Sequence, residues 1–141
     1  MTEQLRLRIP ARPEYLVLGR LVLSGIARCR PIHPDDLGDL KLALTEACTN
    51  SMRHAYASKE GVIEIAFDVD EQSVAIEVID DGPGFEQQPT EATEQLDEGG
   101  LGLAIIHALA EEIEIGRRSN GTGSRLRFRK SLSPFISDEE P

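Results

Sequence analysis

The chain has 141 residues, of which 15 are basic and 25 acidic, so its formal net charge at pH 7 is -10. This length suits a single domain with its own hydrophobic core. The acidic balance opposes non-specific attraction to DNA or to an anionic membrane surface. Because no run is apolar for the ~18 residues that span a bilayer, and no signal-peptide pattern opens the chain, we expect a cytoplasmic protein without a direct nucleic-acid or membrane partner.

The first half of the chain predicts a short strand followed by two helices. Apolar residues alternate with arginine over residues 5–9, which indicates a strand that ends at Pro10. Residues 13–30 predict a helix with two apolar stripes, one for the core and one, which includes Arg20, for a partner. Helical periodicity then predicts a second helix over residues 34–56.

The second half predicts a hairpin, a loop, a helix and two more strands. Residues 62–69 and 73–80 alternate as strands on either side of a tight polar turn. Residues 86–98 are acidic and have almost no apolar content, which indicates a mobile loop. After this loop, we expect a helix at residues 101–112 and strands at residues 113–115 and 124–130.

Neighbouring strands in this order look like hairpins rather than β-α-β units. We therefore expect an α+β two-layer sandwich, with a mixed, mostly antiparallel sheet that three helices cover on one face. A doubly wound dinucleotide-binding fold fits this order poorly. Both cysteines, Cys29 and Cys48, fall in apolar helical stripes without metal-ligand spacing, so we expect buried, reduced thiols.

The predicted helix over residues 34–56 carries a polar edge beside its apolar stripe. Helical geometry places Glu46, Asn50, Arg53 and His54 within an arc of about 100°. An acid, an amide and two possible cations on one edge of a core-packed helix are typical of a nucleotide-phosphate site. The alternative is a solvated flank, on which Glu46 and Asn50 pair with each other or with Arg53.

Two strand positions bring polar groups to the face that we expect to be buried. Asp80 shares the parity of the apolar residues of its strand, and an ionised carboxylate, which only accepts hydrogen bonds, suits an adenine amino group. The alternative is that Asp80 only begins the turn that follows. Ser124 also points inward by parity, so its hydroxyl could bind a base or a bridging water, or only satisfy the neighbouring turn. Thr122 takes this place if the register slips.

Two glycine clusters flank the acidic loop. Gly82 and Gly84 precede it, and Gly100, Leu101 and Gly102 open the helix that follows it. Glycine lets the backbone approach a ligand closely, and the amides at a helix N-terminus can hold phosphate. The alternatives are an ordinary turn and a helix-start hinge. Neither cluster is a Walker loop or a dinucleotide fingerprint, because both lack the lysine or the strand-turn-helix context.

In this combination and order, the motifs above resemble those of the Bergerat-fold (GHKL) ATPases. This superfamily includes gyrase, a class of heat-shock chaperones, histidine kinases and MutL. Within it, nearly all of residues 5–130 is similar to the anti-sigma-factor serine/threonine-protein kinases of the RsbW and SpoIIAB type. The similarity runs from IPARPEY and RLVLSGIA through TEACTNSMRHAY, DDGPGF and GGLGLAII to GTGSRLRF.

The resemblance implies that ATP and Mg²⁺ bind between the helix layer and the sheet. Glu46 would be the general base that takes the proton from a substrate serine, and Asn50 would be the Mg²⁺ ligand. Asp80 would accept a hydrogen bond from the adenine amino group. The other positions of the family's nucleotide site fall on Arg53, His54, Gly82, Gly84, Gly100, Leu101, Gly102 and Ser124.

The resemblance also implies a partner switch by one kinase domain over residues 1–141, with a core at 5–130, an ATP lid at 86–98 and a tail at 131–141. Such a protein sequesters a sigma factor, phosphorylates a serine of an anti-anti-sigma (STAS) protein and forms a homodimer. Arg20 is a candidate partner contact, and the alternative is a surface salt bridge. The alternatives are a nucleotide-dependent sigma- or scaffold-binding module without kinase turnover, and a switch kinase that acts on a larger STAS scaffold.

Overall fold

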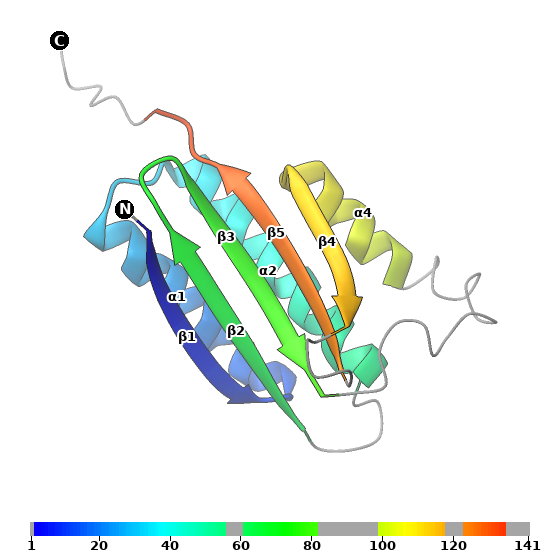
Figure 1. The fold of residues 1–141 in the computed structure, drawn as a ribbon. Helices are drawn as coiled ribbons and strands as arrows, with labels where there is room; N and C mark the ends of the chain where they lie inside the picture. The colour runs from blue at the N-terminus through cyan, green and yellow to red at the C-terminus, as the bar shows by residue number, and fades with distance from the viewer. Residues whose placement is uncertain (1, 56–60, 82–98, 118–122, 135–141) are drawn as a thin grey trace, which may run out of the picture.

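A computed structural model describes residues 2–55, 61–81, 99–117 and 123–134, which form two layers (Figure 1). In chain order the elements are β1 (Glu3–Pro10), the short 3-10 helix η1 (Pro13–Tyr15), α1 (Leu16–Cys29), α2 (Pro34–Ala55), β2 (Val62–Val69), β3 (Ser73–Asp80), α4 (Gly99–Leu109), β4 (Glu112–Arg117) and β5 (Ser124–Ser131). The sheet order is β1-β2-β3-β5-β4, and its four pairings are all antiparallel. The predicted two-layer α+β sandwich is confirmed, and the described strands contain no parallel pair.

One face of the sheet is buried because apolar side chains recur at every second residue of its strands. Phe67, Ile76 and Phe128 lie directly opposite one another on β2, β3 and β5, and all three are fully buried. Leu40 and Leu44 of α2 belong to the same buried cluster. Burying side chains of this size stabilises the fold by roughly 1.5–3 kcal/mol each. This packing holds α2 across the middle of the sheet.

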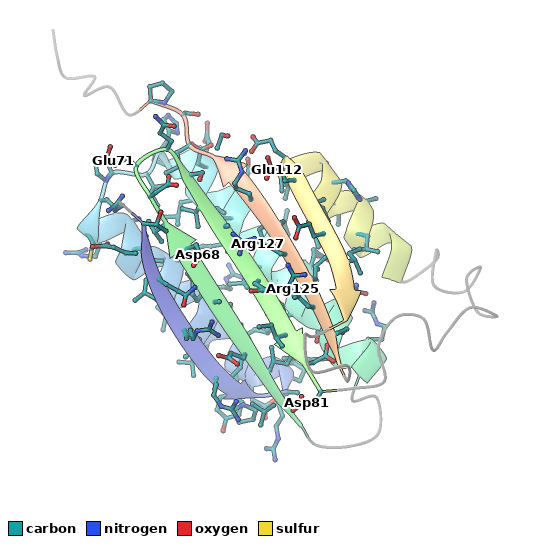
Figure 2. All side chains as sticks on the ribbon, viewed as in Figure 1. Asp68, Glu71, Asp81, Glu112, Arg125 and Arg127 are labelled. Carbon is teal, nitrogen blue, oxygen red and sulfur yellow. The ribbon has the colours of Figure 1, made fainter. Side chains whose placement is uncertain are left out.

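The other face of the sheet carries ion pairs between its strands, most of them between neighbours (Figure 2). Arg127 contacts Asp68 at 3.1 Å, and Arg125 bonds to both Glu77 and Glu114. At the two edges of the sheet, the pairs are Arg6 with Glu64 and Arg129 with Glu112. Opposite charges on adjacent strands stabilise a sheet only modestly, but they make this face polar. The apolar core therefore lies on the helix side alone.

Helix α1 differs in detail from its prediction. Its buried residues are Gly19, Leu23 and Ile26. Helical periodicity predicts Ile26 in one stripe and Leu23 in the stripe with Arg20, so the core does not take one stripe alone. The exposed apolar residues are instead Val17, Leu18 and Leu21. Which face turns inward is decided by contact with α2 and the sheet, which helical periodicity does not specify. None of the described helices combines the length and the hydropathy that crossing a bilayer requires.

The expectation of two buried thiols is wrong for Cys29. This residue ends α1 and is exposed, because it lines the open grooves at that end of the helix instead of the core. Cys48 is fully buried in α2, as expected, and burial raises the pKa of its thiol to about 12. The Cys48 side chain is therefore an uncharged, small apolar group at neutral pH.

Helix α4 ends earlier than predicted. It stops at Leu109 rather than at residue 112, since the next residues join the sheet. The Glu111 amide donates to the Arg129 carbonyl at 2.8 Å, and Glu112 is paired with Arg129 in the β4–β5 register. Cross-strand hydrogen bonds thus replace the last turn that helical periodicity predicts.

Replacing Phe128 with alanine should lower the free energy of unfolding by about 3–5 kcal/mol, because the cavity that it leaves is closed on all sides. Urea denaturation followed by circular dichroism measures the change. The control is Leu42→Ala, whose side chain is 45% exposed, and it should shift the free energy by less than about 0.5 kcal/mol. Equal effects of the two variants would contradict this account of the core.

Candidate functional site

Three elements bring polar side chains together at one end of the sandwich. Helix α2 supplies Glu46 and Asn50, β3 ends at Asp80, and β5 begins at Ser124. Because β3 and β5 are antiparallel, Asp80 lies directly opposite Ser124 in their register. Figure 1 shows the C-terminal end of α2 behind this end of the two strands. The residues that the sequence predicted as a site therefore converge from separate parts of the chain.

The Asp80 carboxylate is held by donors from both layers. Asp80 is only 3% exposed. The Ser51 hydroxyl donates to Oδ2 at 2.5 Å, and the Ser124 hydroxyl donates to the same oxygen at 2.8 Å. The Ser124 backbone amide donates to Oδ1 at 3.3 Å. A buried carboxylate is costly without such partners, and these bonds also fix its orientation as an acceptor.

The structure shows where the two strand residues point and what they bond to within the protein. Asp80 and Ser124 both point inward, as strand parity predicted, and Asp80 does more than begin a turn, because its side chain bonds to α2 and β5. The Ser124 hydroxyl bonds to Asp80 rather than to the neighbouring turn. Ser51 was missed as a site residue, since the sequence placed it only in the apolar stripe of α2. Its hydroxyl directly after Asn50 was the available signal.

Asn50 carries the one unsatisfied polar side chain that the described residues bury. It is 3% exposed, and neither its Oδ1 nor its Nδ2 has a hydrogen-bond partner within the described part of the chain. The pairing of Asn50 with Glu46 or Arg53, which was the alternative to a site, is therefore not observed. An unpaired buried amide costs about 1–3 kcal/mol, so such a group calls for a partner. A bound ligand or ion would supply it.

Glu46 lies one helical turn before Asn50, where α2 meets the start of α4. It is partly buried, and a Cβ built on Gly102 would lie 3.1 Å from its Oε1 atom. Gly100 and Leu101 belong to the first turn of α4, whose free amides and positive dipole end suit an anion. The acid and the predicted phosphate-binding segment are thus neighbours.

The other predicted site residues are described only in part. Arg53 is exposed in the last turns of α2, and His54 lies in the same helix without a described side chain. Gly82 and Gly84 lie outside the described residues, as does the predicted loop at 86–98. Their roles stay predictions.

The described residues fit a magnesium site of the kind that relies on phosphate. They contain no group of three or more His, Cys, Asp or Glu side chains that could hold a metal ion. Mg²⁺ commonly takes one or two protein oxygens and fills its remaining positions with water and substrate phosphates. The unsatisfied amide oxygen of Asn50 is a suitable protein ligand for such an ion.

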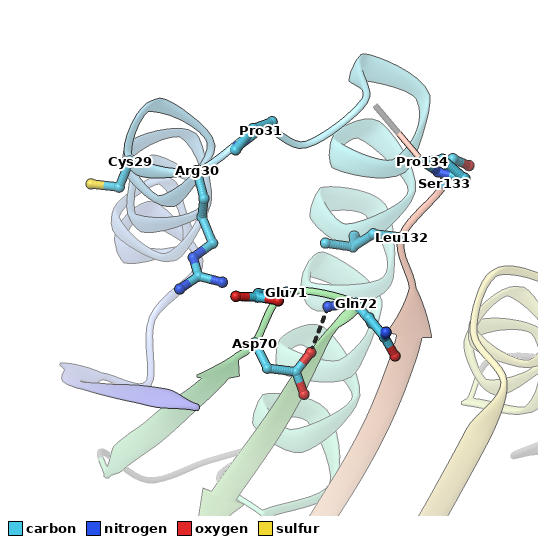
Figure 3. Close-up of a pocket in the computed structure, with 9 residues that line it drawn as sticks. All are labelled: Cys29, Arg30, Pro31, Asp70, Glu71, Gln72, Leu132, Ser133 and Pro134. Carbon is cyan, nitrogen blue, oxygen red and sulfur yellow. Dashed lines mark hydrogen bonds between the residues drawn. The ribbon is translucent and has the colours of Figure 1, made fainter. Parts of the chain in front are cut away.

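A cavity of about 590 Å³ lies at the opposite end of the sheet (Figure 3). Its walls are the end of α1, the turn between β2 and β3 and the residues after β5. The Asp70 carboxylate accepts the amides of Gln72 and Ser73, both at 2.8 Å, and these bonds lower the pKa of Asp70. That carboxylate therefore closes the turn. We assign the candidate site to the Asp80 end, because the unsatisfied amide of Asn50 lies there.

Ser51→Ala should weaken the binding of ATP about tenfold, since Asp80 loses a charge-assisted hydrogen bond that orients it. Titration calorimetry measures the dissociation constant. The matched control is Ser73→Ala, a buried serine that donates to Asp70 at the other end of the sheet. Equal affinities of the two variants for ATP would contradict the role given to Ser51.

Comparison with known proteins places the chain in a family. Residues 9–130 match the family described as histidine kinase-like ATPase domain. A protein of Bacillus licheniformis named serine-protein kinase RsbW is 38% identical over 137 residues, which cover 89% of this chain and 86% of that protein. The protein of the same name from Bacillus subtilis (strain 168) is 36% identical with the same coverage.

The fold is also found in a solved structure. The crystal structure of the RsbU and RsbW domains of a Mycobacterium tuberculosis protein superposes with a TM-score of 0.68. The match covers 96% of this chain and 35% of that one, at 21% identity, so it supports the fold alone. Together with the relatives that exceed 30% identity, these matches show that the chain belongs to the RsbW family of serine-protein kinases, within the histidine kinase-like ATPases.

Proposed function

We propose that this member of the RsbW family is a magnesium-dependent protein-serine kinase and anti-sigma factor that works in a partner switch. It binds ATP, phosphorylates a serine of an anti-anti-sigma (STAS) protein and sequesters a sigma factor. The observation that carries the proposal is the convergence of Glu46, the unsatisfied Asn50 and the buried Asp80 at one end of the sheet. The RsbW relatives support the same chemistry.

In this proposal, Asp80 selects the base. Its carboxylate, oriented by Ser51 and Ser124, accepts a hydrogen bond from the adenine amino group. Guanine presents a carbonyl oxygen at the corresponding position, which would face the carboxylate without a proton between them. Asn50 holds Mg²⁺ through its amide oxygen, and the amides at the start of α4 hold phosphate oxygens.

Glu46 does the proton chemistry. Its carboxylate orients the substrate serine hydroxyl and takes the proton as the serine oxygen bonds to the γ-phosphorus. The bond from that phosphorus to the bridging oxygen breaks, and ADP leaves with its electrons. When bound, Mg²⁺ supplies charge compensation for the phosphoryl oxygens. Because Glu46 and Asn50 are one turn apart on α2, both can address the same phosphate.

Partner binding is proposed for the exposed face of α1. This helix contains two arginines and no acidic residue, in a chain whose net charge is -10. Arg20 lies on it among the exposed residues Val17, Leu18 and Leu21. Such a basic and apolar face suits an acidic partner with apolar anchors. A homodimer in the cytoplasm completes the proposal and rests on the family.

Glu46→Gln should slow phosphate transfer by about 10²–10⁴-fold while the affinity for ATP stays the same, because the amide keeps the shape of the side chain but cannot take a proton. Intact-mass spectrometry of the cognate STAS protein, incubated with ATP and Mg²⁺, measures the transfer. The control is Glu114→Gln on the outer face of the sheet. Transfer by the Glu46 variant at the rate of the original protein would contradict the mechanism. Partner capture without any transfer by the original protein would favour the binding-module alternative.

Arg20→Glu should weaken binding of the sigma factor or of the STAS protein about tenfold or more, because it puts a negative charge in the basic face of α1. Calorimetry with and without ATP measures both affinities. Arg8→Glu, an exposed charge reversal on β1, serves as the control. If neither partner binds the Arg20 variant more weakly than the control, the proposed face is wrong.

A further inference from the structure

A side chain added at Gly102 would meet the carboxylate of Glu46. It is buried in α4, and a Cβ at this position would lie 3.1 Å from Glu46 Oε1. Apart from Leu101, Leu103 and the nearby backbone of α4, no further heavy atom of the described residues comes within 4 Å of that Cβ. The missing side chain therefore leaves room for one specific group, the proposed base.

Four other glycines of the helices and strands, whose surroundings the structure describes, do not share this contact. A Cβ on Gly19 would meet Leu44 of the core, and a Cβ on Gly25, Gly38 or Gly116 would meet nothing within 4 Å. A glycine in a helix interior is less favourable than alanine, because it loses more backbone entropy on folding. Packing against Leu44 accounts for Gly19, and the carboxylate of Glu46 is the contact that accounts for Gly102.

We propose that Gly102 is a positioning residue for phosphate transfer. Its lack of a side chain lets the Glu46 carboxylate occupy the place from which it orients the substrate serine. This inference rests on the proposed kinase function and adds a role for Gly102 that differs from the approach of α4 to the phosphates. It also couples two helices, because the start of α4 then sets the orientation of the base on α2.

The distances allow this role to be tested without unfolding the protein. At 3.1 Å, an added methyl group would force the carboxylate to move by a few tenths of an ångström. The far end of a glutamate can make this movement, and alanine favours the helix, so the fold should tolerate Gly102→Ala. Phosphate transfer is sensitive to shifts of this kind, because a misplacement of 1 Å can cost about 10²-fold in rate.

The experiment compares Gly102→Ala with Gly38→Ala, which adds the same methyl group to α2 in open space. The measurements are single-turnover transfer to the cognate STAS protein at saturating ATP, the dissociation constant for ATP and the midpoint of thermal unfolding. Gly102→Ala should slow transfer about tenfold, change the dissociation constant by less than about twofold and not lower the midpoint. Gly38→Ala should match the original protein in transfer and in affinity.

A second arm uses Glu46→Asp, which withdraws the carboxylate by one methylene group. In this background, Gly102→Ala should cost little further transfer, because the added methyl group no longer meets the carboxylate. A tenfold loss in both backgrounds would overturn the inference. So would a weakened affinity for ATP with an unchanged transfer rate, since the glycine would then serve the phosphates. Absence of transfer by the original protein, or full transfer by Glu46→Gln, would instead overturn the proposed function itself.

Discussion

The hydrogen bonds to the Asp80 carboxylate tie the two layers of the fold together. Ser51 reaches it from α2 and Ser124 from β5, so a buried charge at the end of β3 has donors from both sides. Without these donors the buried carboxylate would cost several kcal/mol, which makes the meeting of the three elements a condition of the fold. The same condition places Glu46 and Asn50 over this end of the sheet.

The buried polar side chains of Asp80 and Asn50 differ in their hydrogen-bond partners. The Asp80 carboxylate has donors from within the protein, whereas the Asn50 amide has no partner among the described residues. The core, centred on Phe67, Ile76 and Phe128, contributes enough to offset one unsatisfied amide of about 1–3 kcal/mol. A ligand that satisfies Asn50 would stabilise the folded state as it binds, which links the affinity of the site to the stability of the protein.

The outer face of the sheet and the exposed face of α1 differ in how their charges are compensated. On the outer face of the sheet, Arg125 and Arg127 are paired with acidic residues of other strands, so that face is polar and internally compensated. On the exposed face of α1, Arg20 lies beside apolar residues, and the helix contains no acidic residue that could compensate its charge. The proposed nucleotide site lies between the layers, and the proposed surface for partners lies on the helix side.

Local pattern in the sequence determined the strands β2 and β3, the helix α2 and the inward direction of Asp80, because alternation and helical periodicity depend only on neighbours along the chain. Tertiary structure decided the features that depend on segments far apart in the sequence. These are the packing of the end of α4 against β5, the exposure of Cys29 and the direction that α1 faces. It also decided the bond from Ser51 to Asp80 and the contact of Gly102 with Glu46. No periodicity reports such contacts, since each depends on where two elements pack in space.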